Sequence, residues 1–203
     1  MKISSKIPAF GDNYKIGYIG FTFHHNSVVS RGIAYFTRWA RMNQIRVSHT
    51  LIVVERNRCV EAEKRTGVTE QPLDKYFDET KTSIFFRKPR RYKNALGLKI
   101  AETALEQVGS RYDKSLIIAQ IMQGCLTGRW VRSIFGDKPD EFISYLLNSD
   151  DKWICSELAA YVLNSQPEYK NKGILRKPEF TIDPQELFED DLIFCKWRGR
   201  LRT

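Results

Sequence analysis

A histidine, a glutamate and a cysteine have types and surroundings that suit nucleophilic catalysis. His49 lies in the β-branched run Val47–Glu55, Glu61 follows a turn soon after it, and Cys155 lies in a helical stretch far downstream. A thiol becomes a strong nucleophile at neutral pH when an imidazolium and a helix N-terminus lower its pKa. A carboxylate beside the imidazole fixes the tautomer. The pattern favours Cys155 as nucleophile, His49 as base and Glu61 as the residue that orients the imidazole.

Each of these residues also has an ordinary structural interpretation. His49 fits a hydrogen-bonded core histidine, Glu61 an exposed strand residue and Cys155 a helix-packing residue, because such residue types recur at these spacings by chance. The adjacent His24 and His25 fit a loop or strand end better than a metal site, since no other ligands accompany them. The sequence indicates no metal site and no cofactor.

A hairpin is expected to position His49 and Glu61. The run Val47–Glu55 and the stretch Cys59–Ala62 suit two antiparallel strands, and residues 56–58, Arg-Asn-Arg, suit the turn between them. Pairing of the two strands would bring the Glu61 carboxylate toward a ring nitrogen of His49.

A helix is expected to carry Cys155 in its early turns. Apolar residues recur at helical spacing from Cys155 to about Asn164, and Asn148, Ser149 and Asp150 offer N-cap side chains just before it. The N-terminal end of this helix must therefore face His49 if the site is to form.

The rest of the chain mixes strand and helix patterns. We expect strands at Lys15–Phe23, with a bulge or close backbone approach at Gly17 and Gly20, at Lys81–Arg87 and, last in the chain, at Leu192–Trp197. We expect an amphipathic helix at Ser27–Met42 and a second helix that has Leu98, Ala101, Leu105 and Val108 on one face and Gly109 at its end. Two more helices are expected at Ser115–Leu126 and Asp140–Leu147 around a surface insertion at Gly128–Gly136, and a capped turn is expected at Thr181–Pro184. No repeat or low-complexity segment appears, so we predict a single α+β domain over residues 1–203.

Composition excludes several classes of protein. The chain has 203 residues, of which 42% are hydrophobic and 12% aromatic, so it can build a core and is not disordered as a whole. Its apolar stretches fall far short of the roughly 20 residues that span a bilayer. The first ten residues lack the apolar core of a Sec signal peptide, so we expect a cytoplasmic location, with release or export by another route left open. The four cysteines show no CxxC spacing, which argues against a zinc finger and a disulfide framework.

Positive charge exceeds negative charge, with 33 Lys and Arg against 24 Asp and Glu and a net charge of +9. The basic residues gather in four clusters: Arg38, Arg41 and Arg46; Arg87, Lys88, Arg90, Arg91 and Lys93; Lys170, Lys172, Arg176 and Lys177; and Lys196, Arg198, Arg200 and Arg202. Nucleic acid, an anionic membrane surface or another acidic partner could bind these clusters. The alternative is that they only make the surface basic and soluble and bind no partner.

Three short strings occur in an order that a known superfamily shares. They are Ser48-His49-Thr50-Leu51-Ile52-Val53, then Val60-Glu61-Ala62, then Trp153-Ile154-Cys155-Ser156-Glu157-Leu158. With them the chain resembles the circularly permuted NlpC/P60 papain-like superfamily, in particular its YiiX-like branch, which is related to the lecithin:retinol acyltransferase group. Gly109-x-x-Tyr112-Asp113 and Thr181–Leu187 resemble two further family motifs, so the resemblance covers about residues 15–197. The chain departs from the family in its first strand, where Gly17 is followed by Tyr18 instead of Asp.

The resemblance implies a permuted papain-like fold, in which an antiparallel sheet packs against helices, with Cys155, His49 and Glu61 as the catalytic triad. It implies an acyl-enzyme at Cys155, with the backbone N–H of that residue as the first oxyanion donor. Members of the superfamily hydrolyse peptide or amide bonds, including those of cell-wall peptides, or move fatty acyl groups. We therefore expect a peptide, amide or acyl-lipid substrate, with amide or peptide cleavage ahead of an acyltransferase or lipase acting on lipid esters. The alternative from another class is a non-catalytic basic module that binds nucleic acid or an anionic surface.

Overall fold

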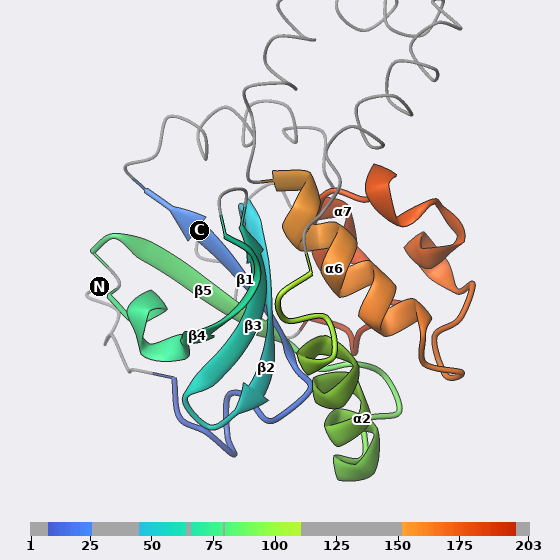
Figure 1. The fold of residues 1–203 in the computed structure, drawn as a ribbon, viewed down its shortest axis with the longest axis horizontal. Coiled ribbons are helices and arrows are strands. Elements are labelled where there is room, and N and C mark those ends of the chain that lie inside the picture. Colours follow the sequence, from blue (N-terminus) through green and yellow to red (C-terminus); the bar gives the residue numbers. More distant parts are fainter. Residues whose placement is uncertain (1–7, 26–44, 64–65, 79, 111–151, 198–203) are drawn as a thin grey trace, which may run out of the picture.

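The protein combines an antiparallel sheet with helices in an α+β arrangement (Figure 1). The computed structural model describes residues 8–25, 45–63, 66–78, 80–110 and 152–197. Five strands form the sheet in the order β4-β3-β2-β1-β5, with every neighbouring pair antiparallel. The strands are β1 (Ile19–His24), β2 (His49–Glu55), β3 (Arg58–Glu63), β4 (Gly67–Pro72) and β5 (Thr82–Arg87).

Helices gather on one side of this sheet. They are α2 (Asn94–Leu105), α6 (Lys152–Asn164) and α7 (Pro184–Glu189), and short 3-10 turns occur at η1 (Leu73–Tyr76), η2 (Gly173–Arg176) and η3 (Glu179–Thr181). In Figure 1, α6 lies beside the sheet with α7 behind it and α2 below it. Both α2 and α6 pack against β2.

The two faces of the sheet bury different cores because side chains alternate along each strand. On the helix-covered face, Ile52, Val60 and Ala62 join the large core that includes Leu158 of α6. The opposite face carries a smaller cluster of buried residues: Tyr14, Tyr18, Leu51, Val53, Cys59, Leu73 and Tyr76. His49 and Glu61 share the parity of the second set, so their side chains belong to that face.

The predicted hairpin is present as β2, a two-residue turn at Arg56 and Asn57, and β3. Its ladder runs from the Ile52–Val60 pair to the Glu55–Arg58 pair. Beyond Ile52, β2 still pairs with β1 as far as His49, and beyond Val60, β3 still pairs with β4 as far as Glu63. The two strands of the hairpin therefore part toward the end that carries His49 and Glu61.

Glycines allow the close approach that the sequence predicts near the first strand. Gly17 has a φ of +79°, and a Cβ placed on it would lie 2.5 Å from the Cα of Gly97 in α2. A Cβ on Gly20 would lie 2.4 Å from the side chain of Leu51. Only glycine allows the turn before β1 to approach the backbone of α2 this closely.

Several other expectations are confirmed with small shifts of boundary. The strand predicted at Lys81–Arg87 is β5, and the capped turn at Thr181–Pro184 leads into α7. The Asp183 side chain accepts a hydrogen bond from the Glu186 N–H at 2.8 Å, and Pro184 occupies the first helical position, as expected for an N-cap.

Two expectations are wrong. The Leu192–Trp197 segment makes only a single bridge, between Phe194 and Pro89, with the Arg90 N–H donating to the Ile193 carbonyl and the Cys195 N–H donating to the Lys88 carbonyl on either side. The helix expected at Leu98–Val108 does form, as α2, but its buried face contains Leu96, Ile100, Ala101 and Ala104, whereas Leu98 and Leu105, together with Val108 beyond its end, are exposed. In addition, no sequence pattern indicated β4, whose Thr, Glu and Gln lack a strong strand signal.

Other expectations lie outside the described residues. They concern the segments Ser27–Met42, Ser115–Leu126, Gly128–Gly136, Asp140–Leu147 and the caps at residues 148–150. In the described part of the chain, no helix combines the length and the apolar character that a membrane crossing requires.

Candidate active site

His49 and Glu61 form a direct pair on the sheet. The Nε2 of His49 donates a hydrogen bond to Oε2 of Glu61 at 2.6 Å. The Glu61 side chain is fully buried, and that of His49 is 13% exposed. Because Nε2 is engaged by the carboxylate, Nδ1 is the ring nitrogen that remains for another partner.

The strand end that carries His49 is anchored on both sides. The Val47 N–H donates to Oε1 of Gln185 at 3.0 Å, and Nε2 of Gln185 donates to the Ile45 carbonyl at 2.9 Å. The Ser48 N–H donates to the Thr22 carbonyl of β1 at 2.8 Å. These bonds link the entry of β2 to α7 and β1, so the backbone that presents the imidazole is fixed.

Cys155 lies in the first turn of α6, is buried, and is hydrogen bonded to the side chain of His49. The helix packs against both β2 and β3. Since these strands part beyond Ile52 and Val60, a residue on the helix-covered side reaches the His49 ring at this end of the hairpin. The N–H of Thr50, which follows His49, also faces the sulfur.

The electrostatics favour an ion pair between Cys155 and His49. Burial pulls the pKa of His49 down, but Cys155 and then Glu61 outweigh it and raise the pKa to about 10. Burial likewise pushes the pKa of Cys155 up, but the His49 ring and then Thr50 reverse this and leave the pKa lowered. A thiolate beside an imidazolium is the arrangement of an activated cysteine nucleophile.

Glu61 is held as a carboxylate by three donors. Besides His49, the Tyr76 hydroxyl donates to Oε2 and the Lys75 ammonium donates to Oε1. Burial alone would raise the pKa of Glu61, but the bonds from His49, Lys75 and Tyr76 lower it to about 2. Glu61 is therefore ionised at neutral pH, where its carboxylate accepts the hydrogen bond from His49.

The structure brings together all three residues singled out in the sequence, Cys155, His49 and Glu61. Sequence reasoning missed Thr50, Lys75 and Tyr76. Thr50 was visible only as a neighbour of His49. Lys75 and Tyr76 belong to the short turn η1, whose sequence Leu-Asp-Lys-Tyr resembles any surface turn, so no pattern marks their approach to Glu61.

The histidine pair is placed as the sequence suggested, at a strand end. Nδ1 of His24 lies 2.8 Å from Oγ1 of Thr82, and Nε2 of His25 lies 3.1 Å from Oγ of Ser83. Within the ranges that the structure describes, no group of three or more His, Cys, Asp or Glu residues is arranged to hold a metal ion.

The other described cysteines differ from Cys155. Cys59 is buried, and burial followed by the nearby Glu61 charge raises its pKa. Cys195 is exposed, and Cys125 lies outside the described residues. The pKa of Cys155 is lowered by its surroundings, whereas that of Cys59 is raised.

One basic residue counted as a surface charge is internal. Arg87 is 1% exposed and donates to the carbonyls of Phe188 and Cys195 and to Oδ1 of Asp191. It anchors β5 to the C-terminal segment and is not accessible to an anionic partner, whereas Lys88, Arg90, Arg91 and Lys93 are exposed.

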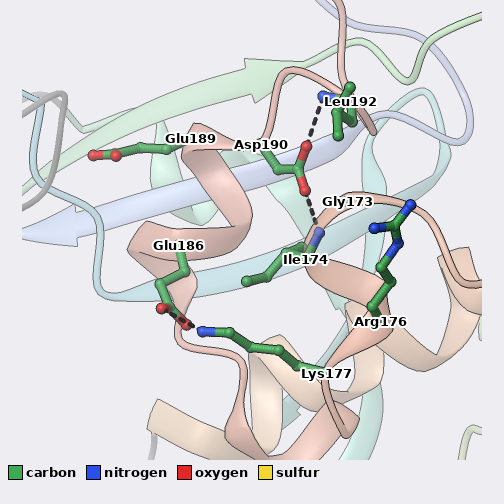
Figure 2. Close-up of a pocket in the computed structure, with 8 residues that line it drawn as sticks. All are labelled: Gly173, Ile174, Arg176, Lys177, Glu186, Glu189, Asp190 and Leu192. Carbon is green, nitrogen blue, oxygen red and sulfur yellow. Dashed lines mark hydrogen bonds and ion pairs between the residues drawn. The ribbon is translucent and has the colours of Figure 1, made fainter.

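A surface recess between η2 and α7 is separate from this site (Figure 2). Its polar groups mostly bind one another: Lys177 pairs with Glu186 at 2.8 Å, and the Asp190 carboxylate accepts from the N–H groups of Ile174 and Leu192. The recess contains none of the residues Cys155, His49 and Glu61. The recess is therefore the place where η2 packs against α7, and most of its polar groups are already paired.

Comparisons of the chain with protein-family models, with curated proteins and with solved structures find no match. The case for a functional site therefore rests on the geometry around Cys155.

Proposed function

We propose that the chain is a cysteine hydrolase of the permuted papain-like kind, which cleaves an amide or peptide bond through an acyl-enzyme at Cys155. The observation that carries the proposal is the continuous network from Cys155 through His49 to Glu61, in which a lowered thiol pKa meets a raised imidazole pKa. A buried cysteine that only packed a helix would have a raised pKa, as Cys59 has.

In the proposed reaction the Cys155 thiolate attacks the substrate carbonyl and forms an Sγ–C bond. The His49 imidazolium then gives its proton to the leaving amine as the C–N bond breaks. Neutral His49 next takes a proton from water, the hydroxyl group attacks the thioester, and the Sγ–C bond breaks to release the acid and restore the thiolate. Glu61 exchanges no proton and keeps the ring oriented throughout.

The start of α6 supplies the first donor for the oxyanion. The first four N–H groups of a helix, those of the N-cap and of the first three residues, have no partner within it, and Cys155 is the fourth residue of α6, directly after them. The negative oxygen of the tetrahedral intermediate would therefore lie at the helix end where the dipole favours negative charge, with the Cys155 N–H as the proposed donor.

Chain order and architecture support the permuted form of the fold. The strands that carry His49 and Glu61 precede the helix that carries Cys155 in the chain. The antiparallel sheet has the helices on one face and the small cluster of buried residues on the other. Peptides and amides, cell-wall peptides among them, are the proposed substrates, and a cytoplasmic location is part of the proposal because the free thiols of Cys59 and Cys195 persist in a reducing compartment.

Alkylation tests the proposal directly. Near pH 7, iodoacetamide should modify Cys155 at least about tenfold faster than the exposed Cys195, because thiolate fraction sets the rate. His49→Ala should remove this advantage, and peptide mass spectrometry reads each cysteine separately. Equal labelling of the accessible thiols would overturn the proposal.

Trapping of the acyl group identifies the reaction class. Anilide, peptide and long-chain ester donors should be compared, with Cys155→Ala as the control. Mass gain on Cys155 from anilides or peptides is the expected result. Gain from long-chain esters alone would replace amide cleavage by lipid acyl chemistry at the same nucleophile.

A further inference from the structure

Lys75 contributes a fourth charge to the site that the triad alone does not explain. Its ammonium pairs with Oε1 of Glu61, on the opposite oxygen from His49 and Tyr76. Its side chain is 34% exposed, whereas that of Glu61 is fully buried, so the pair reaches from the surface into the interior. The same ammonium lies 3.7 Å from Oε1 of Glu63 and 4.9 Å from the centre of the Tyr76 ring.

The charges alternate along the network. In the ion-pair state Cys155 is negative, His49 positive, Glu61 negative and Lys75 positive. Without Lys75 this set would have a net charge of −1 in a buried site, where electrostatic interactions are stronger than in water. The carboxylate that holds the imidazole would then also oppose the negative charge of the nucleophile.

We propose that Lys75 is a positioning residue that balances the charge of the site, so that Glu61 can orient His49 without opposing the Cys155 thiolate. This inference rests on the proposed function. Tyr76 complements Lys75, because it is neutral and buried and its hydroxyl shares Oε2 with the imidazole. The phenol therefore fixes the carboxylate without altering the charge of the site.

The position of η1 supports this role. The Leu73 N–H donates to the Asn57 carbonyl in the hairpin turn at 2.9 Å, and Leu73 is buried in the small cluster with Tyr76. The turn that carries Lys75 is thereby tied to the same hairpin that carries His49 and Glu61, and the ammonium keeps its place relative to both.

Other ionisable groups around Glu61 and Lys75 do not replace this charge. His24 on β1 has a lowered pKa, first through burial and then through the charge of His49, so it is neutral near pH 7. Cys59 is a neutral thiol, and Glu70 is paired with Arg58. The groups that interact with the pair are His24 from β1, His49 from β2, Cys59 and Glu63 from β3 and Tyr76 from η1, while Glu70 acts on Cys59 and Cys155 acts on His49.

The test is the pH dependence of Cys155 alkylation by iodoacetamide, from about pH 3 to about pH 11, in the full chain. Its acid step reports formation of the ion pair, and its alkaline step reports loss of the His49 proton. Removal of a nearby positive charge makes every proton harder to lose, so Lys75→Gln should move both steps to higher pH by about half a unit or more. Gln keeps a hydrogen-bond donor for Glu61 and removes only the charge.

Two controls separate charge from structure. Lys75→Arg keeps the charge and should leave both steps in place, and Lys81→Gln removes a charge from an exposed lysine paired with Asp78 and should do the same. If Lys75→Gln does not fold, Lys75→Met takes its place and is compared with the same two control variants. Unmoved steps, or steps that move in opposite directions, would overturn this inference.

The wild-type profile separates failure of this inference from failure of the proposed function. An ordinary thiol titration at Cys155 in the wild type would overturn both. A low acid step in the wild type, together with unmoved steps in the Lys75 variants, would overturn the role of Lys75 alone.

Discussion

Two glutamates removed from water have opposite surroundings. Glu61 on β3 accepts bonds from His49, Tyr76 and Lys75, and its pKa is lowered to about 2. Glu157 on α6, two residues after Cys155, has a buried Oε2 with no hydrogen-bond partner in the described part of the chain. Burial, and then the charge of Glu179, raise its pKa to about 7.

The difference shows that burial alone does not decide the charge of a carboxyl group in this protein. Burial opposes ionisation at both positions, and the partners determine the outcome. Where three donors converge, the carboxylate is stable and can orient an imidazole. Where no donor offsets burial and a second carboxylate lies nearby, the pKa rises to about 7, so the group is mostly neutral below that pH and adds little negative charge to the helix that carries the nucleophile.

The largest expected effect comes from removing the two reacting residues of the site that contains Glu61. Once a substrate is found, Cys155→Ala and His49→Ala should each lower kcat/KM by about a thousandfold or more, because they remove the nucleophile and the proton carrier. Glu61→Gln keeps one acceptor oxygen and should cost about ten- to a hundredfold. Steady-state kinetics decide the order, and wild-type turnover in Glu61→Ala would remove Glu61 from the site.

Substitution of Glu157 should raise the free energy of unfolding at high pH. The Glu157 pKa is about 7 in the folded chain and 4.5 in the reference state, so its contribution to folding falls as pH rises from 4.5 to 7. Glu157→Gln should therefore match the wild type at pH 4 and exceed its free energy of unfolding by about 1–2 kcal/mol at pH 8, after allowance for partial exposure.

Glu61 provides the matched reference for that measurement. Its pKa is about 2 in the folded chain, so its stabilising contribution is complete above 4.5 and is lost as pH falls toward 2. Urea unfolding across pH should show both windows in the wild type. A Glu157→Gln variant no more stable than the wild type at pH 8 would contradict the contrast between the two carboxyls.

The smallest effect should come from removing one neutral donor. Tyr76→Phe leaves Glu61 with His49 and Lys75 but without the phenol hydroxyl, and should lower the free energy of unfolding by about 1 kcal/mol. Tyr161 on α6 is 44% exposed, so Tyr161→Phe should change stability little. Equal effects in denaturant unfolding would mean that the Tyr76 hydroxyl does not support the carboxylate.

The sequence anticipated the parts of the site that depend on local pattern. The β-branched run around His49, the turn at Arg56 and Asn57, and the helical spacing after Cys155 are short-range signals, and all three elements form. The resemblance in motif order then singled out Cys155, His49 and Glu61, which the structure places in contact.

The remaining parts depend on tertiary contacts that no local pattern contains. Lys75 reaches Glu61 only because η1 folds back over the hairpin, and α2 buries Ile100 and Ala104 because Gly97 lets the helix approach Gly17. The expected last strand is reduced to a single bridge between Phe194 and Pro89, a contact between segments far apart in the sequence.

The parting of β2 and β3 has a consequence for how the site assembles during folding. The hairpin and η1 are close in sequence, so His49, Glu61, Lys75 and Tyr76 can meet through short loops, whereas Cys155 must arrive with α6 from far along the chain. Until that helix docks into the open end of the hairpin, the cysteine remains an ordinary thiol in an unfolded segment. The reactive sulfur thus depends on a long-range contact, so its rate of alkylation at mildly acidic pH should follow the fraction of molecules in which α6 has docked.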